Sequence, residues 1–235
     1  ALDGPTSIYV SGLLAPHMLG PITVAAYSYM SLVPIIMPPV IYMMTTKKER
    51  AIRMPYSSRK ISRRTRIMFP IIVTVLVGTL VPFATPLIGM LMLGNLMRES
   101  GAVERLTKAS SNEIANTVTL FLGLAIGSTM GGEAFLKKET MFILILGLLA
   151  FGLDCVAGVF FAKILNFITG GKVNPIIGAA GISAFPMAAR VCQRVAQEED
   201  FENFLLMHAM GANAAGQVAS VVAGGVVLAL MGAGG

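Results

Sequence analysis

The residues best placed to do chemistry in this sequence are polar side chains inside or beside apolar runs. Asp3 lies in Asp-Gly-Pro-Thr, two residues before Pro5, so it is expected to N-cap a helix that starts there. At membrane depth the same carboxylate would be a hard ligand for a cation or a group that carries a proton. The two roles are compatible, because a capping carboxylate can also serve as a ligand.

Asn213 lies near the middle of the apolar run 203–231, between small residues at 211–216. An amide at that depth needs hydrogen-bond partners. It would either bond to a neighbouring helix or offer a neutral oxygen to an alkali cation, with its small neighbours letting another segment approach. Both interpretations stay open.

Two tyrosines within an apolar run also carry polar groups that need hydrogen-bond partners. Tyr27 and Tyr29 are two residues apart, so on a helix they face different directions. A buried phenol needs a partner. One of them is expected to donate to an ion site or a substrate, and the other to belong to the core or to anchor at the interface.

A further group lies in the Gly/Ala/Pro-rich stretch 174–190, and it comprises Asn174, Gly178, Ser183 and Arg190. Arg190 is four residues after Pro186, about one turn into a helix that would open there. An arginine beside a helix start suits a carboxylate ligand. It could equally extend to the surface or pair with an acid such as Glu198.

Asp154 is the only charge within the apolar run 142–162. An isolated ionised acid at that position is costly, so it must be protonated, paired or facing a cavity. It is a secondary candidate because no broken segment lies next to it in the sequence. Cys155 and Cys192 have no metal-ligand spacing, and no phosphate loop, dinucleotide fingerprint, nucleophile elbow or zinc motif occurs.

The composition shows what must position these residues. Hydrophobic residues make up 55% of the chain, charged residues 13%, and the mean hydropathy is +0.75. The charged share is half the roughly 25% usual in soluble domains. A disordered chain, a disulfide scaffold and an ordinary water-soluble enzyme are excluded. We expect residues 1–235 to form a single transmembrane domain, an all-α polytopic bundle.

Several apolar runs are interrupted, so we expect about five to seven crossings with some helices broken or re-entrant. Runs 142–162 and 203–231 are continuous and 114–130 is weaker, whereas prolines are expected to break 19–45 and to separate 67–80 from 83–97. Residues 7–14 suffice for half a helix, and 175–190 predict irregular backbone plus a helix start. Secondary transporters bind ions at such interruptions, often in inverted repeats. The stretches 3–7 and 178–186 are hypothesised to be equivalent positions of two repeats.

Residues 47–66 form a basic loop, with nine Lys and Arg side chains against the carboxylate of Glu49. The positive-inside bias places this loop in the cytoplasm. It could also contact anionic lipid or an acidic partner. The acidic run at 198–202 is expected to be a solvated turn.

Four stretches together resemble a known family: Asp3 to Tyr9, Ala25 to Met30, Thr45 to Arg50 and Asn174 to Arg190, with His208 to Asn213 fitting as well. The chain is similar to the membrane beta subunit of the biotin-dependent, sodium-pumping decarboxylases, which include the oxaloacetate, methylmalonyl-CoA and glutaconyl-CoA enzymes. Family chains carry further membrane segments before Asp-Gly-Pro-Thr, so the resemblance covers their C-terminal portion.

The resemblance implies a mechanism. A biotin carrier subunit, loaded by a carboxyltransferase subunit, brings carboxybiotin to the cytoplasmic side, where decarboxylation consumes a proton and drives Na⁺ outward. The implied Na⁺ ligands are Asp3, Asn174, Ser183 and Asn213. Asn174, Gly178 and Arg190 are implied to bind carboxybiotin, and Tyr29, Ser183 and Arg190 to act in catalysis. The chain has no biotin-attachment motif of its own.

The implied setting is a multi-pass protein of a bacterial-type inner (plasma) membrane. Its partners are the bilayer, the two soluble subunits and a small membrane subunit of the gamma or delta type, with no nucleic acid. Self-association is left open. Two alternatives use the same features. One is an ion-coupled transporter of a small carboxylate without decarboxylation, and the other is a non-catalytic membrane anchor that docks through 47–66.

Overall fold

A computed structural model describes residues 3–55, 61–128, 137–182 and 184–232, and every regular element in these ranges is a helix. This confirms the all-α membrane class. Among the described residues, three helices are long and apolar enough to cross a membrane: Pro16–Met44, Lys138–Ile168 and Leu206–Leu230. The sequence predicted more crossings, but the other apolar runs fold as shorter helices.

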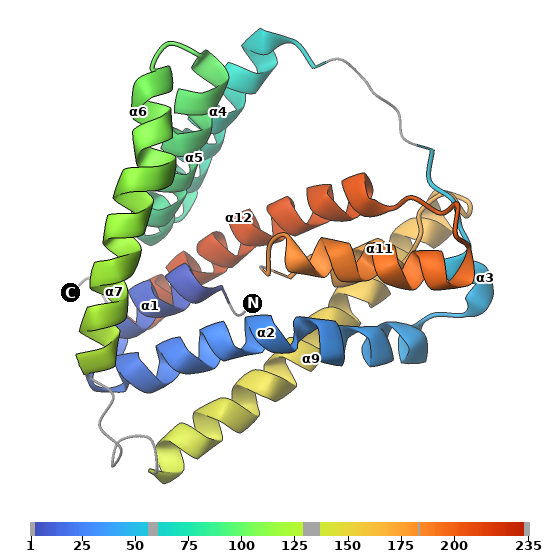
Figure 1. Ribbon diagram of the computed structural model, residues 1–235, viewed down its shortest axis with the longest axis horizontal. Coiled ribbons are helices and arrows are strands. Elements are labelled where there is room, and N and C mark those ends of the chain that lie inside the picture. The colour runs from blue at the N-terminus through green and yellow to red at the C-terminus, as the bar shows by residue number, and fades with distance from the viewer. Residues whose placement is uncertain (1–2, 56–60, 129–136, 183, 233–235) are drawn as a thin grey trace.

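The bundle that carries the candidate residues is built from five helices (Figure 1). They are α1 (Gly4–Leu14), α2 (Leu19–Met44), α9 (Lys138–Ile168), α11 (Met187–Glu199) and α12 (Leu206–Leu230). Helix α2 packs on α1, α9 and α11, while α12 packs on α1 and α11. The first residues of α1 therefore lie inside the bundle, between α2 and α12.

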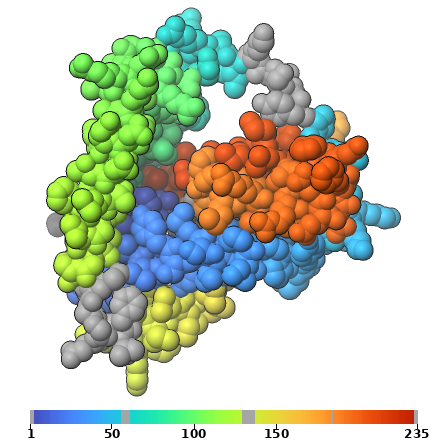
Figure 2. Space-filling view, viewed as in Figure 1, coloured from blue at the N-terminus to red at the C-terminus, as the bar shows by residue number. Residues whose placement is uncertain are grey.

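A second group of helices stands beside this bundle. It consists of α4 (Arg63–Leu80), η2 (Pro82–Ala84), α5 (Thr85–Ser100), α6 (Glu104–Ala109), η3 (Ser110–Ile114) and α7 (Ala115–Ser128). Helices α4 and α5 form a hairpin that meets α12 near η2, and α7 reaches α2. Figure 2 shows a hollow between this hairpin and α12. A small core around Ile88 and Met92 packs the hairpin against Val221 of α12.

Prolines interrupt the helices at one of the two predicted places. Helix α4 ends at Leu80, before Pro82, and Pro86 lies in the first turn of α5, as predicted. The prediction that prolines break 19–45 is wrong, because α2 runs through Pro34, Pro38 and Pro39. A membrane helix tolerates proline where packed neighbours shield the freed carbonyls. Here Met37 and Ile41 are completely buried beside them.

The stretch 174–186 is irregular, as predicted. It holds the single turn α10 (Ile176–Ala179), and α11 opens directly after Pro186. Glycines let the backbone of this stretch pack closely between α9 and α12. A Cβ at Gly158 of α9 would lie 2.2 Å from the carbonyl oxygen of Gly178, and one at Gly216 of α12 would lie 2.2 Å from that of Gly181. The backbone therefore touches both helices at distances only glycine permits.

The outer face of α9 carries large apolar side chains. Phe142, Leu146, Leu149, Phe160 and Phe161 are each more than half exposed. A continuous apolar face of this size is typical of a surface covered by lipid.

Candidate functional site

Asp3 caps α1, as predicted. Its Oδ2 accepts hydrogen bonds from the backbone nitrogen of Thr6 at 3.2 Å and from Thr6 Oγ1 at 2.5 Å. The residue is buried, and the ring of Tyr27 packs on Gly4 beside it. On the other side, Thr6 contacts α12, where a Cβ at Gly224 would lie 2.3 Å from Thr6 Cγ2. A buried carboxylate therefore caps the N-terminus of a half-length helix inside the bundle.

Asn213 joins α12 to the irregular stretch. Its Nδ2 donates to the carbonyl oxygen of Ile182 at 2.5 Å. Its side chain is completely buried, and its Oδ1 has no hydrogen-bond partner. The amide thus makes the predicted packing bond and also leaves a bare oxygen at the centre of an apolar helix. Such an oxygen is costly unless a ligand supplies positive charge or a proton.

Tyr29 is buried between α2 and α9, where its hydroxyl donates to the carbonyl oxygen of Leu144. The ring occupies the space above Gly147, where a Cβ would lie 2.4 Å from it. Tyr27 is 40% exposed and packs on Gly4. The two tyrosines therefore face different neighbours, and Tyr27 is the one beside Asp3.

Asn174 is completely buried, and hydrogen bonds use both ends of its amide. Its Nδ2 donates to the carbonyl oxygens of Arg50 at 2.9 Å and Ile52 at 2.8 Å, and its Oδ1 accepts from the backbone nitrogen of Ile176 at 3.0 Å. In this structure Asn174 ties the segment after α2 to the start of the irregular stretch.

Gly178, Arg190 and Ser183 complete the predicted set. Gly178 lies against Gly158 and Ala162 of α9, so its missing side chain serves close packing. Arg190 lies in the first turn of α11, is exposed, and forms no ion pair with any residue the structure describes. Ser183 lies outside the described residues.

The predicted residues separate into two regions. Asn213 belongs to α12, and Asp3 is joined to that helix through Thr6, which contacts Gly224. Asn213 and Gly224 are eleven residues apart, roughly 16 Å along the helix. Asn174 instead lies where the 47–55 segment meets the irregular stretch. The structure thus places an inner group around the middle of α12 and an outer group at the end of α2.

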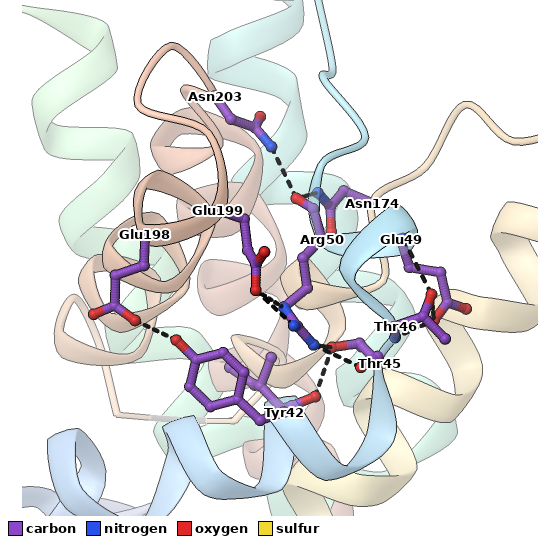
Figure 3. Close-up of polar contacts among 10 residues, drawn as sticks. Tyr42, Thr45, Thr46, Glu49, Arg50, Asn174, Glu198, Glu199 and Asn203 are labelled. Atoms are coloured by element: carbon purple, nitrogen blue, oxygen red, sulfur yellow. Dashed lines mark hydrogen bonds and ion pairs between the residues drawn. The ribbon is translucent and has the colours of Figure 1, made fainter.

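The outer group includes a polar network that sequence reasoning missed (Figure 3). Arg50 at the end of α3 (Lys47–Arg50) is buried, donates to Glu199 Oε1 at 2.6 and 2.9 Å and to the carbonyl oxygen of Thr45 at 2.6 Å, and lies over the ring of Tyr42. Tyr42 in turn donates to Glu198. The acidic run is in part the exposed turn expected from sequence, at 201–202, but Glu199, Asp200 and Glu202 also pair with Arg50 and Arg53 of the basic segment, which the sequence did not indicate.

Asn203 was also missed. It is completely buried, and its Nδ2 donates to the same two carbonyl oxygens that Asn174 contacts, those of Arg50 at 3.0 Å and Ile52 at 3.2 Å. Two distant asparagines thus converge on one turn after α3. No local pattern signals this, because the partners are backbone atoms about 150 residues away.

One pair of this network predicts a pH dependence. Asp200 accepts from Arg53 Nε at 2.6 Å and Nη2 at 2.9 Å, which holds the pKa of the Asp200 carboxyl below its usual value, with burial opposing in part. The contribution to stability is complete at neutral pH and is lost as the pH falls through the lowered pKa. Arg53→Gln should therefore be slightly less stable than wild type near pH 7, and should match it only in acid below the lowered pKa of Asp200, which lies under the usual carboxyl value of about 3.9. Thermal unfolding across this range measures the difference, and a gap that persists in acid would refute the assignment.

The described residues contain no group of three or more His, Cys, Asp or Glu side chains that could hold a metal ion. The oxygen atoms near the middle of α12 are instead carboxylate, amide and backbone carbonyl oxygens. Such donors suit hard cations and not the transition metals that prefer imidazole or thiolate.

Taken together, the fold and the site define an all-helical membrane protein with irregular backbone and buried side-chain oxygen atoms inside its bundle. The chain belongs to the family described as the Na⁺-transporting oxaloacetate decarboxylase beta subunit, which it matches over residues 1–231.

Curated relatives agree with this family. The chain is 54% identical over 226 residues to oxaloacetate decarboxylase beta chain 2 of Salmonella typhimurium, an alignment covering 96% of this chain and 52% of the relative. It is 54% identical over 230 residues to the methylmalonyl-CoA decarboxylase subunit beta of Propionigenium modestum, covering 98% and 58%. The protein of that name from Veillonella parvula is 54% identical over 229 residues, covering 97% and 61%. The chain therefore spans between about half and three fifths of their length.

Proposed function

We propose that this chain forms the sodium-translocating part of a biotin-dependent decarboxylase in the bacterial plasma membrane. Carboxybiotin, delivered by a carrier subunit, loses CO₂, its ring nitrogen takes up a proton, and Na⁺ moves outward. The family match and the relatives' names support the proposal. The observation that carries it is the buried Oδ1 of Asn213, which has no hydrogen-bond partner and lies beside irregular backbone.

The inner group is the proposed Na⁺ path. Asp3 supplies a buried carboxylate, Asn213 a bare amide oxygen, and the irregular stretch its backbone carbonyls. A Na⁺ ion would satisfy the Asn213 oxygen that the protein leaves without a donor. Because a carboxylate binds either Na⁺ or a proton, occupancy by one excludes the other, which is what coupling requires.

The proposed carboxybiotin side lies between the outer group and Arg190, which is nine residues, roughly 13 Å along α11, before Glu199 of that group. Arg190 is exposed in the first turn of α11, where its charge and the helix N-terminus both favour an anion. Asn174 fits less directly, because its amide hydrogens are already donated to the carbonyls of Arg50 and Ile52. Its proposed role is to hold the irregular stretch against the basic segment. The role of Ser183 in Na⁺ binding and proton relay stays a prediction.

The basic segment 47–66 is proposed to face the cytoplasm, where the carrier and carboxyltransferase subunits would dock, with a small membrane subunit alongside. Arg50 and Arg53 of this segment pair with carboxylates of the acidic run, which neutralises part of the segment's positive charge. At the start of α4, Arg66 pairs with Glu99 and Arg63 donates to the carbonyl of Ser100, so Arg64 would be the arginine there most available to anionic lipid.

The proposal is tested by titrating the intact decarboxylase complex with Na⁺ or K⁺ while following thermal stability and carboxybiotin decarboxylation. Na⁺ at about 100 times its dissociation constant should stabilise the complex by about 2.7 kcal/mol, and K⁺ should not. Asn213→Ala should weaken this Na⁺ response about tenfold or more. Asp3→Asn keeps a capping oxygen but loses the charge, so it should fold and lose Na⁺-dependent decarboxylation.

Asn112→Ala is the matched control, because Asn112 is an exposed amide that bonds to the carbonyl of Lys108 far from the bundle centre. It should leave the Na⁺ response unchanged. Equal effects of Na⁺ and K⁺ on the wild-type complex would refute the proposal. Na⁺-dependent carboxylate transport without copurifying biotinylated protein would favour the secondary transporter instead.

A further inference from the structure

Asp154 is a half-buried carboxylate within the membrane span α9, among the residues the structure describes. It lies midway along α9 (Lys138–Ile168), the longest and most apolar of the three candidate spans. An ionised carboxylate at the centre of a span is costly, so it persists where it faces a cavity or serves a function. The structure places it at the border of two cavities.

The smaller cavity lies between α2 and α9. It has a volume of about 10 Å³, enough for roughly one water molecule, and its lining includes Tyr29, Asp154 and Ile182. The larger one lies between α9, the irregular stretch and α12. It has a volume of about 280 Å³, and Asp154, Gly181 and Ser220 contribute to its lining. Asp154 and Ile182 line both cavities.

A third space connects this region to the other carboxylate. A groove of about 420 Å³ lies between α1 and α12, and its lining includes Thr6, Ser220 and Ala223. Ser220 and Ala223 also line the larger Asp154 cavity. Thr6 Oγ1 donates to Asp3. A single turn of α12 therefore separates the surroundings of Asp3 from those of Asp154.

That turn carries oxygen atoms able to accept a cation. Ser220 Oγ donates its hydrogen to the carbonyl of Gly216 at 2.9 Å, so its lone pairs remain as acceptors. Asn213 lies seven residues earlier, on the same face of α12, with its bare Oδ1. Its amide nitrogen holds Ile182, which lines both Asp154 cavities.

We infer that Asp154 is a second carboxylate station for the transported cation, binding Na⁺ and H⁺ in exchange in the pocket it shares with Ser220. When Na⁺ binds, the carboxyl proton leaves to water in the pocket. When Na⁺ leaves, a proton returns. The inference rests on the proposed sodium transport and extends it, because it adds a residue and a location to the cation path.

The titratable or charged groups on the elements around this part of α9 include Tyr27 and Tyr29 on α2, Cys155 and Lys163 on α9, Arg190, Cys192 and Arg194 on α11, and His208 on α12. Lys163 pairs with Glu49 at 3.1 Å, two to three turns from Asp154. Tyr29 shares a cavity with Asp154. Among the described residues that line the larger cavity, Asp154 is the one carboxylate, so its charge is expected to respond to Na⁺ there.

The test uses the intact complex reconstituted in vesicles, with ²²Na⁺ uptake, decarboxylation and Na⁺-dependent thermal stability measured from acid to neutral pH. Asp154→Asn should raise the Na⁺ concentration for half-saturation at least tenfold and flatten its dependence on pH. Asp154→Glu keeps a carboxylate, so its half-saturation concentration and its pH dependence should both lie closer to those of wild type. Ser220→Ala should raise half-saturation several-fold. Thr74→Val is its matched control, because Thr74 bonds to the carbonyl of Pro70 at 2.7 Å on α4, away from these cavities.

Asp154→Asn with wild-type half-saturation and pH dependence would overturn the inference while leaving the proposed function intact. If that variant does not assemble, Ser220→Ala decides: a raised half-saturation supports the inference, and a value equal to wild type and to Thr74→Val overturns it. A wild-type complex that does not respond to Na⁺ would overturn the proposed function itself, and the inference with it.

Discussion

Replacing Arg50 by methionine is expected to lower the free energy of unfolding by about 3–5 kcal/mol, the cost of leaving one partner of a buried ion pair alone. The Arg50 and Glu199 side chains are 7% and 19% exposed. The change removes two hydrogen bonds to Glu199 and one to the carbonyl of Thr45. Methionine keeps most of the apolar stem, so the loss reports charge and hydrogen bonding. Reversible unfolding in detergent micelles measures it.

The matched control is Arg53→Met. Arg53 contacts Asp200 and Glu202, but its own side chain is 56% exposed, so solvent screens these pairs. Loss of exposed pairs has a small effect on stability. Similar destabilisation by the two substitutions would show that burial of Arg50 does not matter, and the network would then be no more than a surface feature.

The second large effect is expected at Gly158. Alanine there would place a Cβ 2.2 Å from the carbonyl oxygen of Gly178, about 1 Å inside normal contact. Because the obstructing atom is backbone, α9 and the irregular stretch must separate, at a cost of about 1–3 kcal/mol. Gly158 also lines the Asp154 pocket, and Asn213 is bonded to the same stretch. Stability and the Na⁺ response should therefore fall together.

Gly152→Ala on the same helix is the control, because a Cβ there meets nothing within 4 Å. Alanine favours a helix over glycine, so this variant should be as stable as wild type or slightly more stable. Thermal unfolding and Na⁺ titration of both variants make the comparison. Equal behaviour of the two would mean that the close contact can relax without cost.

The residues that organise the outer network also bear on how the two regions communicate. Asn174 and Asn203 hold the carbonyls of Arg50 and Ile52 from two sides. Asn174 begins the irregular stretch, and Ile182 near its other end is held by Asn213. One segment of backbone thus joins the proposed carboxybiotin side to the proposed cation path. Coupling between the sites would require this segment to have two arrangements.

The sequence by itself determined the features that depend on neighbours along the chain. The cap at Asp3, the half-length first helix, the irregular stretch before Pro186 and the long spans around Asp154 and Asn213 could all be predicted. Each depends on local chemistry: an acid before a helix-opening proline, glycines that prevent regular packing, or an unbroken apolar run. The family motifs are local in the same sense.

Only the tertiary structure decided what depends on distant partners. It showed that α2 continues through three prolines, that Arg50 meets Glu199, and that Asn203 and Asn174 converge on one turn. It also placed Asp154 beside Ser220 in one pocket. A side chain's cost inside a membrane is set by the groups facing it from other helices. Those groups are brought together by packing, which no spacing along a single chain reveals.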